Sequence, residues 1–233
     1  MIARIETILR RAMELPTALL VLVEIFVLLA GVVSRFVFHH PFVWSDELAS
    51  ILFLWLAMLG SVVALQRMQH MRLTAVVSRL RPTLQPYAEV LSVAAPALFL
   101  AILLPYAWDY AAEEFYIETP ALGLPNIVRA AAIPAGAAFM LLTCALRLVR
   151  FRLQPLLSVI AVLALIAGGL FFLAPVLKAL GNWNLVFFFV VLLAAGVLLG
   201  VPIGFAFGTA TVAFLMCVTR VPLTVVVSRM DEG

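Results

Sequence analysis

Long apolar runs separated by short polar segments make up most of this chain. A membrane-spanning helix needs about 20 mostly apolar residues, at a rise of about 1.5 Å per residue. Five runs meet this requirement: Leu15–Phe38, Glu47–Leu65, Tyr87–Tyr106, Ile127–Val149 and Leu156–Leu177. The pattern therefore predicts five transmembrane helices in series.

A sixth apolar stretch, Leu185–Val218, is too long for one straight crossing. Gly200, Pro202 and Gly204 interrupt it, and a proline cannot donate a backbone hydrogen bond. Two arrangements fit this break: a hairpin of two short helices, or one helix broken within the membrane. We favour the hairpin.

The first apolar run could also belong to a signal peptide, because Arg4, Arg10 and Arg11 precede it. The run is longer than the apolar region of a signal peptide, and no small-residue cleavage site follows it. We interpret it as an uncleaved transmembrane helix.

Composition supports a membrane protein. The 233 residues are 66% hydrophobic and 12% charged, with a mean hydropathy of +1.19, whereas soluble domains are about 45–50% apolar and about 25% charged. Disordered, collagen-like, nucleic-acid-binding and disulfide-scaffold classes do not fit this composition. The two cysteines, Cys144 and Cys217, lie in apolar runs, which is typical of small buried side chains. The predicted fold class is an all-α integral membrane protein: a four-helix bundle, a joining helix and a Gly/Pro-broken hairpin.

The distribution of basic residues predicts a cytoplasmic N-terminus, because cytoplasmic segments are enriched in Lys and Arg. With that orientation, ten arginines lie inside: Arg4, Arg10, Arg11, Arg67, Arg72, Arg79, Arg81, Arg147, Arg150 and Arg152. The outside segments contain three basic residues: Arg35, Arg129 and Lys178.

Two connecting segments have patterns of their own. The segment 67–82 places apolar residues on one face of a helix, which predicts an amphipathic helix in the cytoplasmic interface. The segment 106–125 combines aromatic residues with acids and is expected to be an outer loop. Its aromatic residues suit an interfacial belt, and its acids are either solvated or available to a basic docking partner. These acids are Asp109, Glu113, Glu114 and Glu118.

Enzyme motifs are missing from the sequence. It has no P-loop, no GxSxG and no HExxH motif. The histidines, His39, His40 and His70, are expected in loop or interface positions, without the paired arrangement that a membrane haem needs. We predict that the chain is not an enzyme, holds no metal and needs no cofactor.

Glu24 lies near the middle of the first predicted helix. An ionisable residue at that depth is costly and usually faces other protein groups. It is either a coupling or proton site, or a structural carboxyl hydrogen-bonded to a residue such as Ser61 or Ser92. We favour the structural role, since the sequence places no second acid at this depth.

A second cluster joins the first two predicted helices. Arg35 ends the first, and Asp46 and Glu47 open the second, where the helix dipole favours carboxylates. We expect Arg35 to pair with Glu47 or Asp46 across the short connection, with Trp44 as an anchor at headgroup level.

Several short stretches follow one another in a specific order along the first part of the chain. They are Arg35-Phe36-Val37-Phe38 with Pro41, Trp44 and Asp46-Glu47; Phe53-Leu54-Trp55 with Gly60; His70; Thr119-Pro120-Ala121-Leu122-Gly123-Leu124-Pro125; and Ile133-Pro134-Ala135-Gly136. In this order they resemble the small membrane subunit (DctQ type) of tripartite ATP-independent periplasmic (TRAP) transporters. The resemblance covers about residues 1–150.

The later stretch Leu198–Gly208 resembles the opening of the large (DctM type) subunit of the same transporters. The resemblance implies three parts: a DctQ-like scaffold domain at 1–150, a joining transmembrane helix at 151–180, and the truncated start of a DctM-like subunit at 181–233. The candidate structural and subunit-contact residues are then Glu24, Arg35, Trp44, Asp46, Glu47, His70, Gly200 and Pro202.

The resemblance also implies a function. The chain would be a membrane component of an ion-gradient-driven transporter for organic acids in the bacterial inner membrane. It would serve as a non-catalytic scaffold for the large subunit, which would hold the substrate and the coupling ion, sodium. An extracytoplasmic solute-binding protein would deliver the substrate. The alternative is a membrane anchor or assembly subunit of another complex, which would be distinguished by cofactor ligands within its helices.

Overall fold

The computed structural model describes residues 2–67 and 81–232. Backbone contacts divide the chain into two compact units. Unit 1 comprises residues 1–67, 104–140 and 226–233, and unit 2 comprises residues 68–103 and 141–225. The boundaries of these units cross the domains predicted at 1–150, 151–180 and 181–233, which remain a prediction.

Five helices in the described residues have the length and apolar composition of a membrane span: Arg11–Phe36, Val43–Arg67, Gln85–Tyr116, Ile127–Leu148 and Leu153–Ala179. Each of them overlaps one of the five predicted runs. No β-strand is formed in 2–67 or 81–232 apart from an isolated bridge between Glu118 and Pro125. The chain is therefore an all-α integral membrane protein, as predicted.

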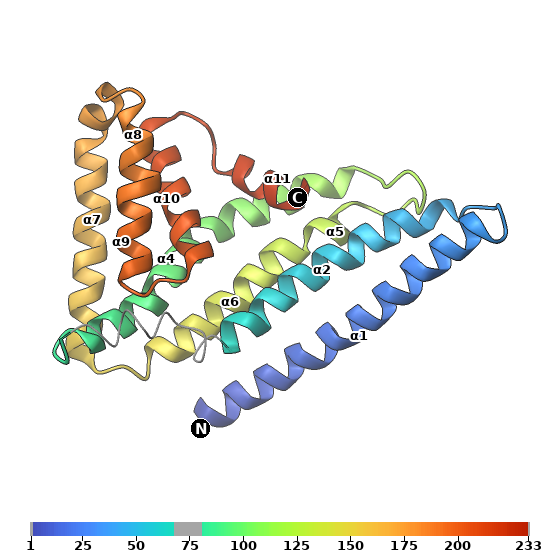
Figure 1. Ribbon diagram of the computed structural model, residues 1–233, viewed down its shortest axis with the longest axis horizontal. Coiled ribbons are helices and arrows are strands. Elements are labelled where there is room, and N and C mark those ends of the chain that lie inside the picture. The colour runs from blue at the N-terminus through green and yellow to red at the C-terminus, as the bar shows by residue number, and fades with distance from the viewer. Residues whose placement is uncertain (1, 68–80, 233) are drawn as a thin grey trace. The chain divides into compact units, whose positions relative to one another are not determined.

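Unit 1 is built on the antiparallel pair of α1 (Ile2–Phe36) and α2 (Val43–Arg67), which lie side by side in Figure 1. On its other side α2 contacts α5 (Ile127–Ala130), which leads into α6 (Ala132–Leu148). Gly136 of α6 lies close to α2, because a Cβ there would lie 2.7 Å from Met58 Cε and 2.8 Å from Met58 Cβ. Only glycine fits this position without a shift of Met58.

Unit 2 packs α7 (Leu153–Ala179) against α10 (Ile203–Val218). The first part of α4 (Gln85–Glu113) joins them, with Val90 and Ala94 packed on Val159 of α7. Ala95 of α4 packs in the same way on Val201 and Ala206.

The sixth apolar stretch forms the predicted hairpin. Its first arm consists of α8 (Trp183–Val186), a π-helical segment (Phe187–Leu192) and α9 (Leu193–Leu198), and its second arm is α10. The arms pack on each other, with Phe188 and Phe189 both in contact with Phe214. Gly200 turns the chain with a φ of +93°, a conformation that favours glycine, and Pro202 immediately precedes α10.

Two predicted boundaries were wrong. The third helix was expected to end near Pro105, but α4 continues through Glu113 and then forms a 3₁₀ turn, η2 (Glu114–Tyr116). A proline removes only one backbone donor, which a membrane helix tolerates, so Pro105 lies inside the helix. The first helix likewise starts at Ile2 and contains Pro16. The predicted amphipathic helix at 67–82 falls almost wholly outside the described residues.

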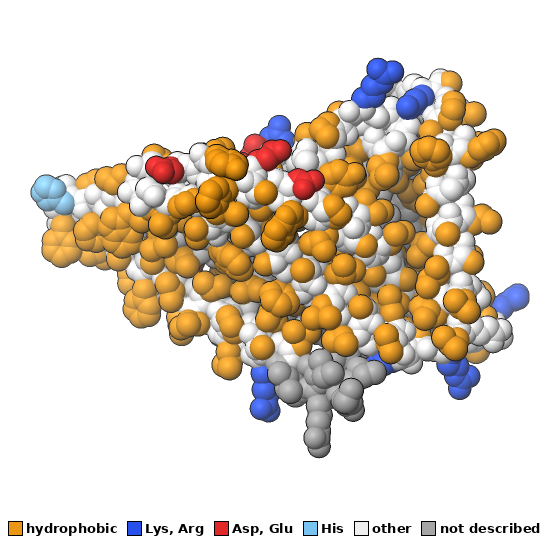
Figure 2. Space-filling view, turned by 180° about the vertical axis from the view of Figure 1, so that it is seen from behind, with side chains coloured by type: hydrophobic (Ala, Val, Ile, Leu, Met, Phe, Trp, Pro, Cys, Tyr) orange, Lys and Arg blue, Asp and Glu red, His pale blue; other side chains and the backbone are white. Residues whose placement is uncertain are grey.

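Large apolar side chains remain exposed on several helices. In the apolar 18-residue windows of the α1 and α7 spans, only 11% and 6% are buried within the chain. Hydrophobic side chains are spread over the face drawn in Figure 2. A surface of this kind needs lipid or a protein partner to cover it.

Candidate functional site

The connection between α1 and α2 is closed by an ion pair. Arg35 Nη2 donates a hydrogen bond of 3.0 Å to Asp46 Oδ2, so Asp46 is the partner among the two candidates. Both side chains are exposed, by 54% and 76%, and an exposed pair contributes at most about 1 kcal/mol. Trp44 stacks on Phe42 with a ring separation of 5.5 Å.

Hydroxyl groups hold the same connection from inside. Ser34 is 1% exposed and accepts a hydrogen bond from the Phe42 backbone amide at 3.3 Å. Ser45 is also buried and donates to the Phe42 carbonyl at 2.7 Å. These bonds fix the start of α2 and therefore the direction of Asp46 and Glu47.

Glu47 has a different role from the one expected. Its Oε2 accepts hydrogen bonds of 2.8 Å from the backbone amides of Ala121 and Leu122. The carboxylate thus ties the loop at 117–126 to the N-terminal part of α2. Sequence reasoning missed this contact, although a loop with free backbone donors requires acceptors somewhere in the fold.

The loop is also closed on itself. The Thr119 amide donates to the Leu124 carbonyl at 2.8 Å, and the Leu124 amide donates to the Thr119 hydroxyl at 3.1 Å. Gly123 has a φ of +63° between them. At the end of the loop, the Asn126 side-chain amide donates to Glu114.

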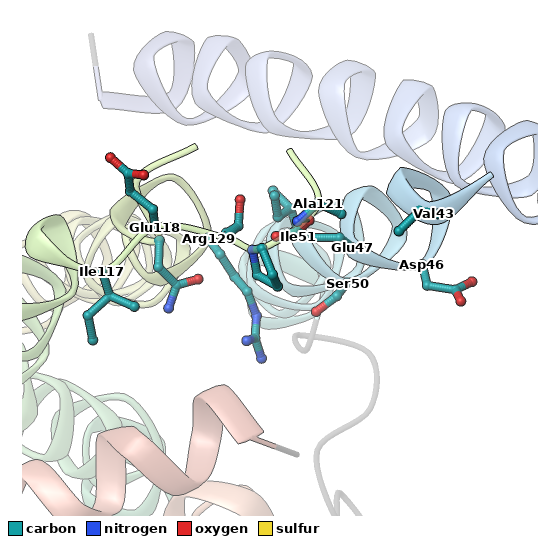
Figure 3. Close-up of a pocket in the computed structure, with 12 residues that line it drawn as sticks. Val43, Asp46, Glu47, Ser50, Ile51, Ile117, Glu118, Ala121 and Arg129 are labelled. Carbon is teal, nitrogen blue, oxygen red and sulfur yellow. Dashed lines mark hydrogen bonds between the residues drawn. The ribbon is translucent and has the colours of Figure 1, made fainter. Parts of the chain in front are cut away.

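A pocket of about 510 Å³ lies between this loop and α2 (Figure 3). Three acids and one base line it: Asp46, Glu47, Glu118 and Arg129. Figure 3 shows Asp46 and Glu118 at opposite ends of the lining, with Glu47 and Arg129 between them. Arg129 is already paired with Asp231, at 3.6 Å, and Asp46 with Arg35, at 3.0 Å, so Glu47 and Glu118 supply the negative charge of the lining that these two pairs do not offset. This arrangement suits a cationic group.

The four acids proposed for docking are placed differently. Asp109 and Glu113 are exposed on the last turns of α4, and Glu118 is exposed in the loop. Glu114 is half-buried and bonded to Asn126. Of these four, Glu118 lines the pocket.

Glu24 is buried in unit 1, with 8% exposure. Its Oε2 has no hydrogen-bond partner in the described part of the chain. Ser61 and Ser92 donate their hydroxyls to the carbonyls of Ala57 and Glu89, each at 2.8 Å. The structural role of Glu24 stays a prediction.

The remaining predicted residues lie elsewhere. Gly200 and Pro202 form the hairpin turn of unit 2. His70 is outside the described residues. In the ranges 2–67 and 81–232, no cluster of three or more His, Cys, Asp or Glu residues could hold a metal ion.

Five span-length apolar helices and a loop tied to the start of α2 define a multi-pass membrane protein. Residues 24–154 match the family described as tripartite ATP-independent periplasmic transporters, DctQ component. The chain belongs to this family, and it is therefore a TRAP transporter component of the bacterial inner membrane.

Relatives agree with this assignment. The sialic acid TRAP transporter small permease protein SiaQ of Vibrio cholerae is 26% identical over 128 residues, covering 54% of this chain and 73% of SiaQ. The C4-dicarboxylate TRAP transporter small permease protein DctQ of Rhodobacter capsulatus is 28% identical over 100 residues, covering 42% of this chain and 44% of that protein.

A third relative is larger. The sialic acid TRAP transporter permease protein SiaT of Haemophilus influenzae is 48% identical over 44 residues, which are 19% of this chain. The match spans only 7% of the length of SiaT.

Proposed function

We propose that residues 24–154 form a static scaffold on which the large permease subunit of a TRAP transporter is mounted. The family match over these residues is the observation that carries the proposal. A transporter that moves one domain against another needs a part that stays fixed in the membrane. Such a part needs no substrate site of its own.

The exposed apolar helices support this role. The α1 and α7 spans bury little of their surface within the chain, so both have faces available to lipid or to the large subunit. The hairpin at 183–218 is the start of the large-subunit part in this proposal, and α7 is the joining helix. The short match to SiaT supports a fused arrangement.

We also propose that the pocket beside Glu47 helps to dock the extracytoplasmic solute-binding protein. Its lining combines Asp46, Glu47 and Glu118, and further acids on α4 extend the negative surface. A basic side chain of the partner would find complementary charge there, which favours both approach and orientation.

The transported substrate is proposed to be an organic acid. The relatives SiaQ and DctQ are named for sialic acid and C4-dicarboxylate transport. The coupling ion, sodium, would bind to the large subunit. The chain itself would carry out no reaction and hold no cofactor.

The test is reconstitution of the full chain with its large subunit and solute-binding protein. Binding of the solute-binding protein is measured with the double variant Asp46→Asn/Glu118→Gln. We expect about tenfold weaker binding at low salt and a smaller salt dependence, because exposed charge contacts are screened by ions.

The matched control is Glu14→Gln. Glu14 pairs with Arg67 at 2.9 Å, away from the pocket. Unchanged binding in the double variant, or an equal loss in the control, would contradict the docking site. Absence of a stable complex between this chain and the large subunit would contradict the scaffold.

A further inference from the structure

The short helix α11 (Thr224–Glu232), which follows the hairpin, has two different faces. Val227 and Asp231 are buried, at 0% and 6% exposure, and they are four residues apart on one side of the helix. Arg229, Met230 and Glu232 are exposed. A buried carboxylate beside a buried valine is unusual, because burying a charge is costly unless it has partners.

The partners of Asp231 come from the DctQ-like region of the chain. The Tyr110 hydroxyl donates to Asp231 Oδ2 at 3.0 Å, and Arg129 Nη1 lies 3.6 Å from the same oxygen. Arg129 Nη2 also donates to the Asp231 backbone carbonyl. Tyr110 is on α4 and Arg129 is on α5, at sequence separations of 121 and 102 residues from Asp231.

The cluster of Tyr110, Arg129 and Asp231 is better suited to fixing the position of α11 than to increasing the free energy of unfolding. The side chains of Asp231 and Arg129 are 5% and 26% exposed, so both charges are largely desolvated. In the described residues, Asp231 Oδ1 and Arg129 Nε are buried without a hydrogen-bond partner. A buried ion pair whose polar atoms are not all hydrogen-bonded contributes little net stability. Removing one partner nevertheless destabilises the protein, because the other charge is left buried and unpaired.

We propose that Tyr110 and Arg129 form a receptor that recognises the carboxylate-bearing helix α11 and seats it on the DctQ-like region. The partner that this receptor fits is a short amphipathic helix with an aspartate four residues after a buried aliphatic side chain. The inference rests on the proposed function in one respect, that the segment after residue 181 belongs to the large-subunit part. The receptor is thus a polar contact point between the two parts, and its Arg129 also lines the acidic pocket.

The test is the accessibility of a single cysteine at Val227 in the purified full chain. Cys144 and Cys217 are replaced by alanine, and Val227→Cys is exposed to a short pulse of a polar maleimide. In the otherwise unchanged chain the cysteine is protected. Asp231→Asn or Arg129→Gln raises the labelling rate by about tenfold or more, because the remaining group is left buried and unpaired.

The control variants lie on the opposite face of α11. Arg229 and Glu232 form an exposed pair at 2.6 Å, and Arg229→Gln or Glu232→Gln should leave the labelling rate within about twofold, as for other exposed pairs. Tyr110→Phe removes only a hydroxyl, so it replaces Arg129→Gln in the labelling experiment if Arg129→Gln does not fold. It should raise labelling by about threefold or more, since Asp231 loses a hydrogen bond.

Fast labelling in the unchanged chain would overturn the proposal, as would equal labelling rates in cluster and control variants. The readout needs no transport and no second protein. Failure of the complex with the large subunit would therefore refute the scaffold function while leaving the receptor intact, and the reverse result would refute the receptor alone.

Discussion

At the scale of single residues, charged side chains in unit 1 differ by how much they are desolvated. Arg35 and Asp46 form an ion pair that is exposed to solvent. Glu24, in contrast, is buried in the middle of a membrane span, and its Oε2 has no hydrogen-bond partner among the described residues. A carboxyl at such a depth is expected to be neutral or to find a partner.

Glu47 and Arg35 are expected to differ in their contribution to stability, although both belong to the same connection. Glu47→Ala removes the acceptor of two backbone amides, Ala121 and Leu122, and should lower the melting temperature of the purified protein by several degrees. Arg35→Ala breaks an exposed pair and should cost less than about 1 kcal/mol. Thermal unfolding in detergent measures both.

The conservative variant Glu47→Gln separates geometry from charge. Its amide oxygen can still accept the two backbone hydrogen bonds, so its melting temperature should lie between those of the wild type and Glu47→Ala. A larger loss in Arg35→Ala than in Glu47→Ala would show that the ion pair, not the loop contact, holds this end of unit 1.

Sequence reasoning identified the residues of this connection but not all of their partners. Arg35 and Asp46 are close in sequence and flank a short turn, so their pairing follows from local geometry. Glu47 contacts residues 74 and 75 positions away, and this distance depends on how the loop folds back onto α2. The Tyr110–Asp231 contact was missed for the same reason, because no local pattern links residues so far apart.

At the scale of elements, the hydrophobic pattern predicted the existence of the helices better than their ends. Apolar runs of about 20 residues identify membrane spans because lipid leaves few alternatives to a helix. The first and third runs were expected to begin at Leu15 and to end at Tyr106, yet α1 begins at Ile2 and α4 continues to Glu113, with Pro16 and Pro105 inside these helices. The hairpin turn was predictable, since Gly200 permits the positive φ that the turn requires and the ring of Pro202 restricts its own φ.

Gly136 gives a test of packing between α2 and α6. Gly136→Ala places a Cβ 2.8 Å from Met58 Cβ and should destabilise the protein by about 1–3 kcal/mol, as overpacked cores do. The measurement is thermal unfolding in the same detergent used for the wild type.

Gly168 in α7 is the matched control, because a Cβ there meets no atom within 4 Å. Gly168→Ala should be neutral or stabilising by up to about 1 kcal/mol, from the higher helix propensity of alanine. An equal loss in both variants would mean that helix flexibility, rather than contact with Met58, sets the requirement for glycine.

At the scale of the whole molecule, exposed apolar surface and charge distribution determine how the chain sits in a membrane. The α1 and α7 spans depend on lipid or a partner for most of their burial. The orientation of the chain in the membrane needs a second criterion, since five apolar spans can cross the bilayer with the N-terminus on either side. The distribution of arginines provides the remaining constraint, with ten on one predicted side against three basic residues on the other.

Single cysteines in a background lacking Cys144 and Cys217 test this orientation in intact cells. His40 and Tyr116 are exposed in segments predicted outside, and Gln154 is exposed in a segment predicted inside. We expect an impermeant maleimide to label His40→Cys and Tyr116→Cys but to label Gln154→Cys only after the membrane is permeabilised. The opposite pattern would place the acidic pocket on the cytoplasmic side, where an extracytoplasmic binding protein could not reach it, and would leave the contact between α11 and the Tyr110–Arg129 receptor unaffected.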